Sequence, residues 1–274
     1  MTDSSAQSAT TAEEQDSDLY LVPPVLRAIT VLRYIAAGNP CRNLSSTAKK
    51  LSINRTTLIR IIHTLMRERL IEEIAPGAGY QLGAGLIVLA AGAISNRDVV
   101  RIAKPVLAEL SKQLNLSAHL GILDERDVVY MIRETPNTHL VSNVREGSRL
   151  PAHATTMGRV LLSHLTGDEL RHLYRDIDME TFTSQTPSTL EELIGQLAIE
   201  LNDGIVWNIS TFEAGIGSCA CAVYDHTGTV IAAINVTGPD AYFKIDEDAL
   251  KNIELQMRKA ADLISAELGY AKTT

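Results

Sequence analysis

The chain has 274 residues, and 25 Lys and Arg against 33 Asp and Glu give a formal net charge of −8. Hydrophobic residues make up 45% and charged residues 21%, a globular composition that excludes a fibrous or mostly disordered protein. The longest nearly apolar run, residues 82–95, is too short to span a bilayer, and no secretory signal follows Met1. Three cysteines, two of them in one Cys-x-Cys, favour a reduced, cytoplasmic protein over a disulfide scaffold.

Charge is distributed unevenly along the chain. Residues 1–18 contain five acidic and no basic residues and show no apolar periodicity, which predicts a disordered acidic tail. Residues 19–83 contain nine basic and three acidic residues, whereas residues 84–274 carry a net charge of −9. Because the local field at a binding face matters more than the total charge, the basic segment favours a polyanionic partner.

Residues 19–83 predict a winged helix-turn-helix. Apolar residues recur every three or four positions from Val25 to Ile35, which predicts a first helix. A second helix is expected over residues 45–51, with Ser45 or Ser46 as N-cap, and a third from the cap Asn54 through Arg69. The next run reads as strand, Pro-Gly turn and strand, so a hairpin follows the three helices.

Residues 84–97 predict a linker helix, and residues 98–274 a mixed domain with hairpins. A helix over residues 98–114, which Pro105 bends or restarts, precedes two strands around an exposed turn. Further helices are expected at 156–165, 190–201 and 246–268, and further strands at 205–209, 218–225 and 229–238. Strands and helices in this order, with antiparallel hairpins, indicate an α+β sensor domain.

The start of the third helix carries the candidate DNA-reading residues. In a recognition helix the N-terminal residues enter the major groove, and here they are Arg55, Thr56, Thr57 and, one turn later, Arg60. Arg donates two parallel hydrogen bonds to guanine, and Thr contacts a base or a thymine methyl. The candidate phosphate contacts are Lys49, Lys50, His63, Arg67 and Arg69.

Alternative roles stay open for several of these residues. Arg67 and Arg69 come late in the helix, where a solvated face explains them equally well. Thr56 and Thr57 are also candidate helix caps.

Motifs along the chain resemble the IclR family of transcriptional regulators. Thr56-Thr57, Arg60, Thr64-Leu65 and Tyr80-Gln81-Leu82-Gly83 are similar to the family's amino-terminal pattern. Residues 150–165 and 203–239 are similar to two blocks of its carboxy-terminal half. The resemblance covers residues 21 to 265 and implies a GAF-like domain that binds a small organic molecule, often a carboxylate or aromatic acid.

The resemblance also implies an effector pocket between the sheet and a loop-helix segment. The residues that it assigns to the pocket are Leu150, Thr156, Met157, Asn208, Ile216, Ser218, Asn235 and Thr237. Asn235 and Thr237 lie two apart on a strand and therefore share a face. Two alternatives remain: Ser218, Asn235 and Thr237 as edge-strand residues that face water, and Leu150 and Met157 as plain core. His153 is expected to make a structural hydrogen bond.

The chain has Arg159 where many members have Lys, Ser210-Thr211 where many have acidic residues, and Asn208 where some have Asp.

No pattern of residues predicts catalysis, a metal site or a cofactor. Cys219 and Cys221 point the same way on a strand, but paired ligands for zinc are missing, so buried thiols explain them better. The basic helical module and the family resemblance together imply a ligand-responsive regulator of a catabolic operon that binds operator DNA as a homodimer or homotetramer. The alternative is a small-molecule sensor or enzyme whose helical module contacts protein instead of DNA.

Overall fold

The computed structural model describes residues 20–95, 97–136, 144–244 and 246–271. The chain divides into two compact units between Ala93 and Ile94. The predicted acidic tail, residues 1–18, lies outside the described residues. Among the described helices, none is both long and apolar enough to cross a bilayer.

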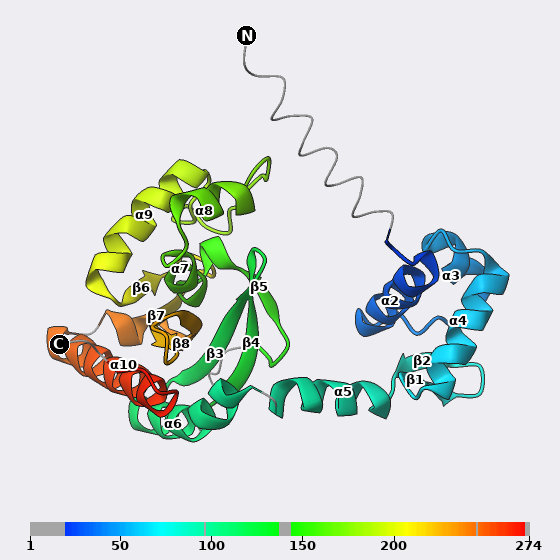
Figure 1. The fold of residues 1–274 in the computed structure, drawn as a ribbon, viewed down its shortest axis with the longest axis horizontal. Helices are drawn as coiled ribbons and strands as arrows, with labels where there is room; N and C mark the ends of the chain where they lie inside the picture. Colours follow the sequence, from blue (N-terminus) through cyan, green and yellow to red (C-terminus); the bar gives the residue numbers. More distant parts are fainter. Residues whose placement is uncertain (1–19, 96, 137–143, 245, 272–274) are drawn as a thin grey trace, which may run out of the picture. The chain divides into compact units, whose positions relative to one another are not determined.

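The first unit has the predicted order of three helices and a hairpin, followed by most of a fourth helix (Figure 1). Its elements are α2 (Pro23–Ala36), α3 (Leu44–Lys50), α4 (Arg55–Arg67), β1 (Ile71–Ala75), β2 (Gly79–Leu82) and α5 (Ala84–Ser95).

Asparagine side chains fix the starts of α3 and α4. Oδ1 of Asn54 accepts a hydrogen bond from the backbone N–H of Thr56 at 2.9 Å, so Asn54 is the cap of α4, as predicted. The cap of α3 is Asn43, which accepts from the N–H of Ser46, and the prediction of Ser45 or Ser46 was wrong. The capped starts of both helices are exposed to solvent.

An apolar stripe on α4 forms the core of this unit. Leu58, Ile61, Ile62 and Leu65 are buried in one cluster with Val31 and Ile35 of α2. Pairs three and four apart lie on one side of a helix, so this packing turns the polar side of α4 outward.

The second unit is an α+β domain built on a six-stranded sheet, which confirms the predicted fold class. The strand order is β5-β4-β3-β8-β7-β6, and every neighbouring pair is antiparallel. The strands are β3 (Ser117–Asp124), β4 (Asp127–Glu134), β5 (Arg149–Pro151), β6 (Val206–Ile209), β7 (Ile216–Tyr224) and β8 (Val230–Pro239). The helices are α6 (Asp98–Leu114), η1 (Ala152–Ala154), α7 (Thr156–Leu162), α8 (Gly167–Leu173), α9 (Leu190–Asp203), η2 (Asp240–Phe243) and α10 (Glu247–Glu267).

Each face of this sheet packs against its own set of helices. α6 and α10 cover one face, while α7 contacts β6, β7, β8 and β3 from the other (Figure 1). Residues of one strand alternate between these two cores: Ala118 and Leu120 face α6, while Gly121 lies against Met157 of α7. The candidate site lies on the α7 face.

Two local predictions in this unit needed correction or completion. α6 is a single helix that continues through Pro105. The short helix α8 lies between the predicted helices at 156–165 and 190–201, where no element was predicted, and Thr166 and Glu169 form a capping box at its start.

Candidate functional site

The start of α4 presents the predicted base-reading side chains to solvent. Arg55, Thr56 and Arg60 are exposed, and Thr57 is half-buried. The cap Asn54 precedes them, and the apolar stripe of α4 lies on the opposite side of the helix. The geometry of α4 is therefore that of a helix whose first two turns can enter a groove.

The cations of the first unit have no acidic partners in the part of the chain that the structure describes. Lys49 and Lys50 are exposed in the last turn of α3, and His63, Arg67 and Arg69 are exposed on and just after α4. Every ion pair identified among the described residues lies in the second unit. The unpaired charges of the first unit remain available to phosphate oxygens.

A cavity at the start of α7 gathers seven of the eight residues assigned to the effector pocket. These are Leu150, Thr156, Asn208, Ile216, Ser218, Asn235 and Thr237. The part of the cavity that the centre of a water molecule can reach has a volume of about 70 Å³. Because one water needs roughly 10–15 Å³ by this measure, the cavity has room for a few waters or one small organic molecule.

Met157, the eighth residue, is not among those that line the cavity. It is fully buried in the core under α7, where its Sδ and Cε lie against the position of Gly121. The plain-core alternative therefore fits Met157. Leu150 both packs against this core and lines the cavity.

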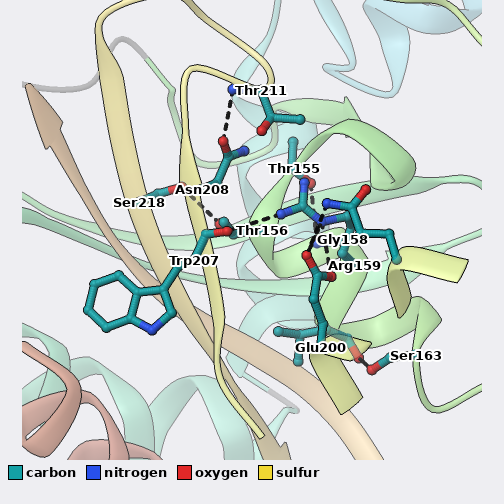
Figure 2. Close-up of polar contacts among 12 residues, drawn as sticks. Thr155, Thr156, Gly158, Arg159, Ser163, Glu200, Trp207, Asn208, Thr211 and Ser218 are labelled. Atoms are coloured by element: carbon teal, nitrogen blue, oxygen red, sulfur yellow. Dashed lines mark hydrogen bonds and ion pairs between the residues drawn. The ribbon is translucent and has the colours of Figure 1, made fainter. Parts of the chain in front are cut away.

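Strand register brings the polar lining residues together. Ser218 of β7 pairs with Asn208 of β6 on one side and with Thr237 of β8 on the other. Oγ1 of Thr156 lies 3.1 Å from Oγ of Ser218, which joins the first residue of α7 to the sheet (Figure 2). Because β7 and β8 are interior strands and Asn235 and Thr237 are buried, these side chains do not face water at an edge.

Sequence reasoning missed six lining residues: His119, Tyr130, Val144, Thr155, Phe212 and Glu213. His119 lies opposite Asn235 across the β3–β8 pairing, and Nδ1 of its ring is 2.9 Å from Oδ1 of Asn235. Burial, aided by the charge of Arg133, lowers the pKa of His119 to about 4, so its imidazole is neutral at pH 7. Burial also raises the pKa of the Tyr130 hydroxyl, which stays protonated.

The described lining is therefore almost uncharged. Glu213 is its single acidic residue and is exposed, and no Lys or Arg occurs among the described lining residues. Hydroxyl, amide and imidazole groups among apolar side chains suit a small polar ligand.

A buried ion pair lies behind the cavity and ties α7 to its neighbours (Figure 2). Nε of Arg159 donates to both carboxylate oxygens of Glu200 on α9, at 3.0 and 3.1 Å. One Nη donates to the backbone carbonyl of Trp207 on β6 at 3.3 Å. The Arg159 side chain is 1% exposed and that of Glu200 is 13% exposed. Arg159 therefore fixes α7, which begins with the cavity residue Thr156, relative to the strand that carries Asn208.

Comparison with known proteins identifies the family. Residues 24–74 match the IclR helix-turn-helix domain, and residues 91–266 match the carboxy-terminal domain of bacterial IclR transcriptional regulators. The chain belongs to the IclR family. It is therefore a helix-turn-helix transcriptional regulator, and since the family is one of regulators, it is not an enzyme.

Individual relatives of this IclR protein align over almost their whole length. The HTH-type transcriptional regulator XynR of Escherichia coli is 29% identical over 91% of this chain and 98% of XynR. A crystal structure from Rhodococcus sp. RHA1, described as that of a proposed transcriptional regulator, is 29% identical, with a TM-score of 0.79 over 90% of this chain and 98% of that one. An IclR homologue of Microbacterium hydrocarbonoxydans, solved in complex with 4-hydroxybenzoate, shares the fold at 20% identity, with a TM-score of 0.76 over 89% of this chain and 98% of that one.

The departures from the family pattern have structural consequences here. Thr211 donates its N–H to Oδ1 of Asn208 at 2.8 Å, and its carbonyl accepts from the hydroxyls of Thr183 and Thr186. Asn208 and Thr211 thus organise the loop beside the cavity with neutral groups. Arg159 in place of Lys supplies a planar donor set that bonds to Glu200 and to a backbone carbonyl together.

The remaining reactive side chains are held in structural positions. Cys219 and Cys221 are buried, and burial raises the pKa of both thiols, that of Cys221 to about 12. Nε2 of His153 lies 2.9 Å from the carbonyl of Glu180, the structural hydrogen bond that was expected. Within the described ranges, no group of three or more His, Cys, Asp or Glu is placed to hold a metal ion.

Proposed function

We propose that this IclR protein controls a catabolic operon in the cytoplasm, binding operator DNA with its first unit and a small organic or aromatic acid with its second. The observation that carries the proposal is the cavity, which collects seven of the residues assigned to the effector pocket. The complex of an IclR homologue with 4-hydroxybenzoate supports this class of ligand.

In the proposed DNA complex, α4 lies in the major groove. Arg55 and Arg60 donate to guanine edges, and Thr56 and Thr57 contact neighbouring bases. Lys49, Lys50 and His63 contact phosphates and add affinity that depends on salt. All of these side chains except the half-buried Thr57 are exposed, and the cations have no acidic partners in the described part of the unit, which supports this assignment.

We also propose that the protein binds operator DNA as a homodimer or homotetramer. Helix-turn-helix dimers read half-sites about 34 Å apart, one helical turn of DNA. α5 exposes three consecutive apolar side chains, Ile87, Val88 and Leu89, at 71%, 71% and 63%, and α2 exposes Val25, Leu26 and Ile29. Exposed apolar side chains gathered on a helix are typical of an interface.

A titration of DNA and ligand tests the function. DNA from upstream of the protein's own gene is titrated by fluorescence anisotropy at several salt concentrations, with and without candidate acids such as 4-hydroxybenzoate. We expect binding that weakens steeply as salt rises and shifts with an effector. The double variant Ser218→Ala/Thr237→Val should lose the response to effector and keep DNA binding. Failure to bind the promoter DNA at low salt, with or without candidate acids, would refute the proposal.

A further inference from the structure

His119 carries an unsatisfied group in the cavity wall. Among the described residues that line the cavity, only His119 has a buried side-chain polar atom without a hydrogen-bond partner, its Nε2. The side chain has no exposed surface. Buried polar atoms are nearly always hydrogen-bonded in proteins, so an unsatisfied nitrogen on a residue that lines the cavity points to a ligand group that completes it.

The hydrogen bond at the other ring nitrogen determines what Nε2 can accept. Oδ1 of Asn235 is a carboxamide oxygen and only accepts, so Nδ1 of His119 holds the proton of this bond. The ring is neutral at pH 7 because burial and the charge of Arg133 outweigh the bond to Asn235. In a neutral ring with the proton on Nδ1, the Nε2 atom carries a lone pair and accepts one hydrogen bond.

The surroundings of the ring restrict the donor further. Tyr130 packs edge-on against the imidazole with ring centroids 5.5 Å apart. A bare carboxylate at Nε2 would be repelled by the lone pair and would find no Lys or Arg in the described lining. An ammonium group would donate, but Glu213, the one carboxylate in the described lining, is exposed. Burying a charge without a buried partner costs more than burying a hydroxyl.

We propose that the effector is a hydroxylated small organic molecule whose hydroxyl group donates a hydrogen bond to Nε2 of His119. This inference rests on the proposed function, because it assigns a chemical group to the effector of the same cavity. His119 is then the residue that distinguishes a hydroxylated effector from its deoxy analogue. A site built to bond a hydroxyl discriminates strongly, since the analogue leaves the buried nitrogen unpaired.

The protonation of the ring is tested without any ligand. A ¹H–¹⁵N spectrum of histidine-labelled protein at pH 7, assigned by comparison with His119→Asn, should show a neutral ring with the proton on Nδ1. A proton on Nε2, or a charged ring, would overturn the inference whatever binds in the cavity.

Paired probes test the hydrogen bond itself. Calorimetry compares 4-hydroxybenzoate with benzoate, and lactate with propionate, on the wild type, His119→Asn and His119→Gln. Asn keeps a donor for Asn235 but has no atom at Nε2, whereas the longer Gln side chain places an amide oxygen near it. At least one hydroxylated probe should bind wild type tenfold or more tightly than its partner. That preference should vanish in His119→Asn and return in part in His119→Gln.

The outcomes separate this inference from the proposed function. If each hydroxylated probe binds no more tightly than its deoxy partner, the role of His119 is overturned. The same holds if the preference for a hydroxylated probe persists in His119→Asn. In both cases the cavity remains the effector site. Failure of every probe to bind the protein and to change DNA binding counts against the proposed acid-binding function and against this inference with it. Melting temperatures of both variants close to that of wild type show that the substitutions leave the fold intact.

Discussion

Arg60 lies on the exposed side of α4, one turn after Arg55, and has no acidic partner among the described residues. If its guanidinium donates two bonds to a guanine, Arg60→Ala lowers affinity for the operator by about 1–3 kcal/mol and relaxes sequence preference at one position. Lys50→Ala should instead weaken binding to all sequences and reduce the salt dependence by about one counterion. Anisotropy titrations on operator and scrambled DNA separate these effects.

A matched control for Arg60 is available in the second unit. Arg101→Ala removes an equally long cation that is exposed and whose acidic partner among the described residues is Asp98 on its own helix. Equal losses of operator affinity in Arg60→Ala and Arg101→Ala would mean that total charge, and not base reading by α4, governs binding.

Arg159 makes the most deeply buried ion pair identified among the described residues. Arg159→Leu leaves the carboxylate of Glu200 without its cation, and breaking a buried pair costs about 3–5 kcal/mol. Because Glu200 keeps some solvent contact, we expect the lower end of that range by urea denaturation. Arg159→Leu/Glu200→Leu should recover part of the loss, since it removes the uncompensated charge as well.

The pH dependence of Arg159→Leu follows from Glu200. Burial already raises the pKa of Glu200 while Arg159 opposes the shift, so the variant raises that pKa further above the unfolded value. The native state then binds more protons than the unfolded state, and stability falls as pH rises. The deficit of the variant relative to wild type should be smaller at pH 5 than at pH 7.5. A deficit that is constant across this window would show that lost packing, and not the charge of Glu200, causes it.

At the scale of elements, α5 is a helix whose apolar residues are largely exposed in the single chain. A lysine at Val88 would place a charge among Ile87 and Leu89, and burying an unpaired charge is costly. If α5 forms the dimer interface, Val88→Lys shifts sedimentation toward the monomer and weakens operator binding. Ile199→Lys on α9 is the control, because Ile199 is as exposed, at 68%, but lies in the other unit. Unchanged sedimentation of Val88→Lys would exclude α5 as the interface.

Elements with strong local signals were predictable from the sequence. The cap Asn54 and the stripe from Leu58 to Leu65 lie within one helix, so spacing alone indicated α4. α8 was missed although Thr166-Gly167-Asp168-Glu169 is a capping-box sequence, because only two turns of helix follow it. A short helix leaves little apolar periodicity to recognise.

The cavity was predictable only in part, because it depends on pairings between distant strands. The polar residues of β7 and β8 lie in motifs that resemble the family, so they were assigned. His119 and Tyr130 lie on β3 and β4, more than 100 residues before Asn235, and only the β3–β8 pairing brings His119 to its amide. Nothing in the local sequence around His119 indicates that partner.

At the scale of the whole molecule, regulation requires that the two binding events be coupled. An effector changes DNA affinity only if it binds two arrangements of the protein differently. A coupling of about 1–3 kcal/mol corresponds to a change of roughly 5–150-fold in affinity. Linkage requires that operator DNA change effector affinity by the same factor.

Both arms of this cycle are measurable on the full chain. Anisotropy gives DNA affinity with and without saturating effector, and calorimetry gives effector affinity with and without operator. We expect the factor by which effector changes DNA affinity to equal the factor by which operator DNA changes effector affinity, and both to differ from one. In Arg60→Ala, effector affinity without DNA should match wild type, because Arg60 lies on α4 and the effector cavity lies in the second unit. Factors of one in both arms would mean that the two sites act independently and that occupancy of the cavity does not regulate DNA binding.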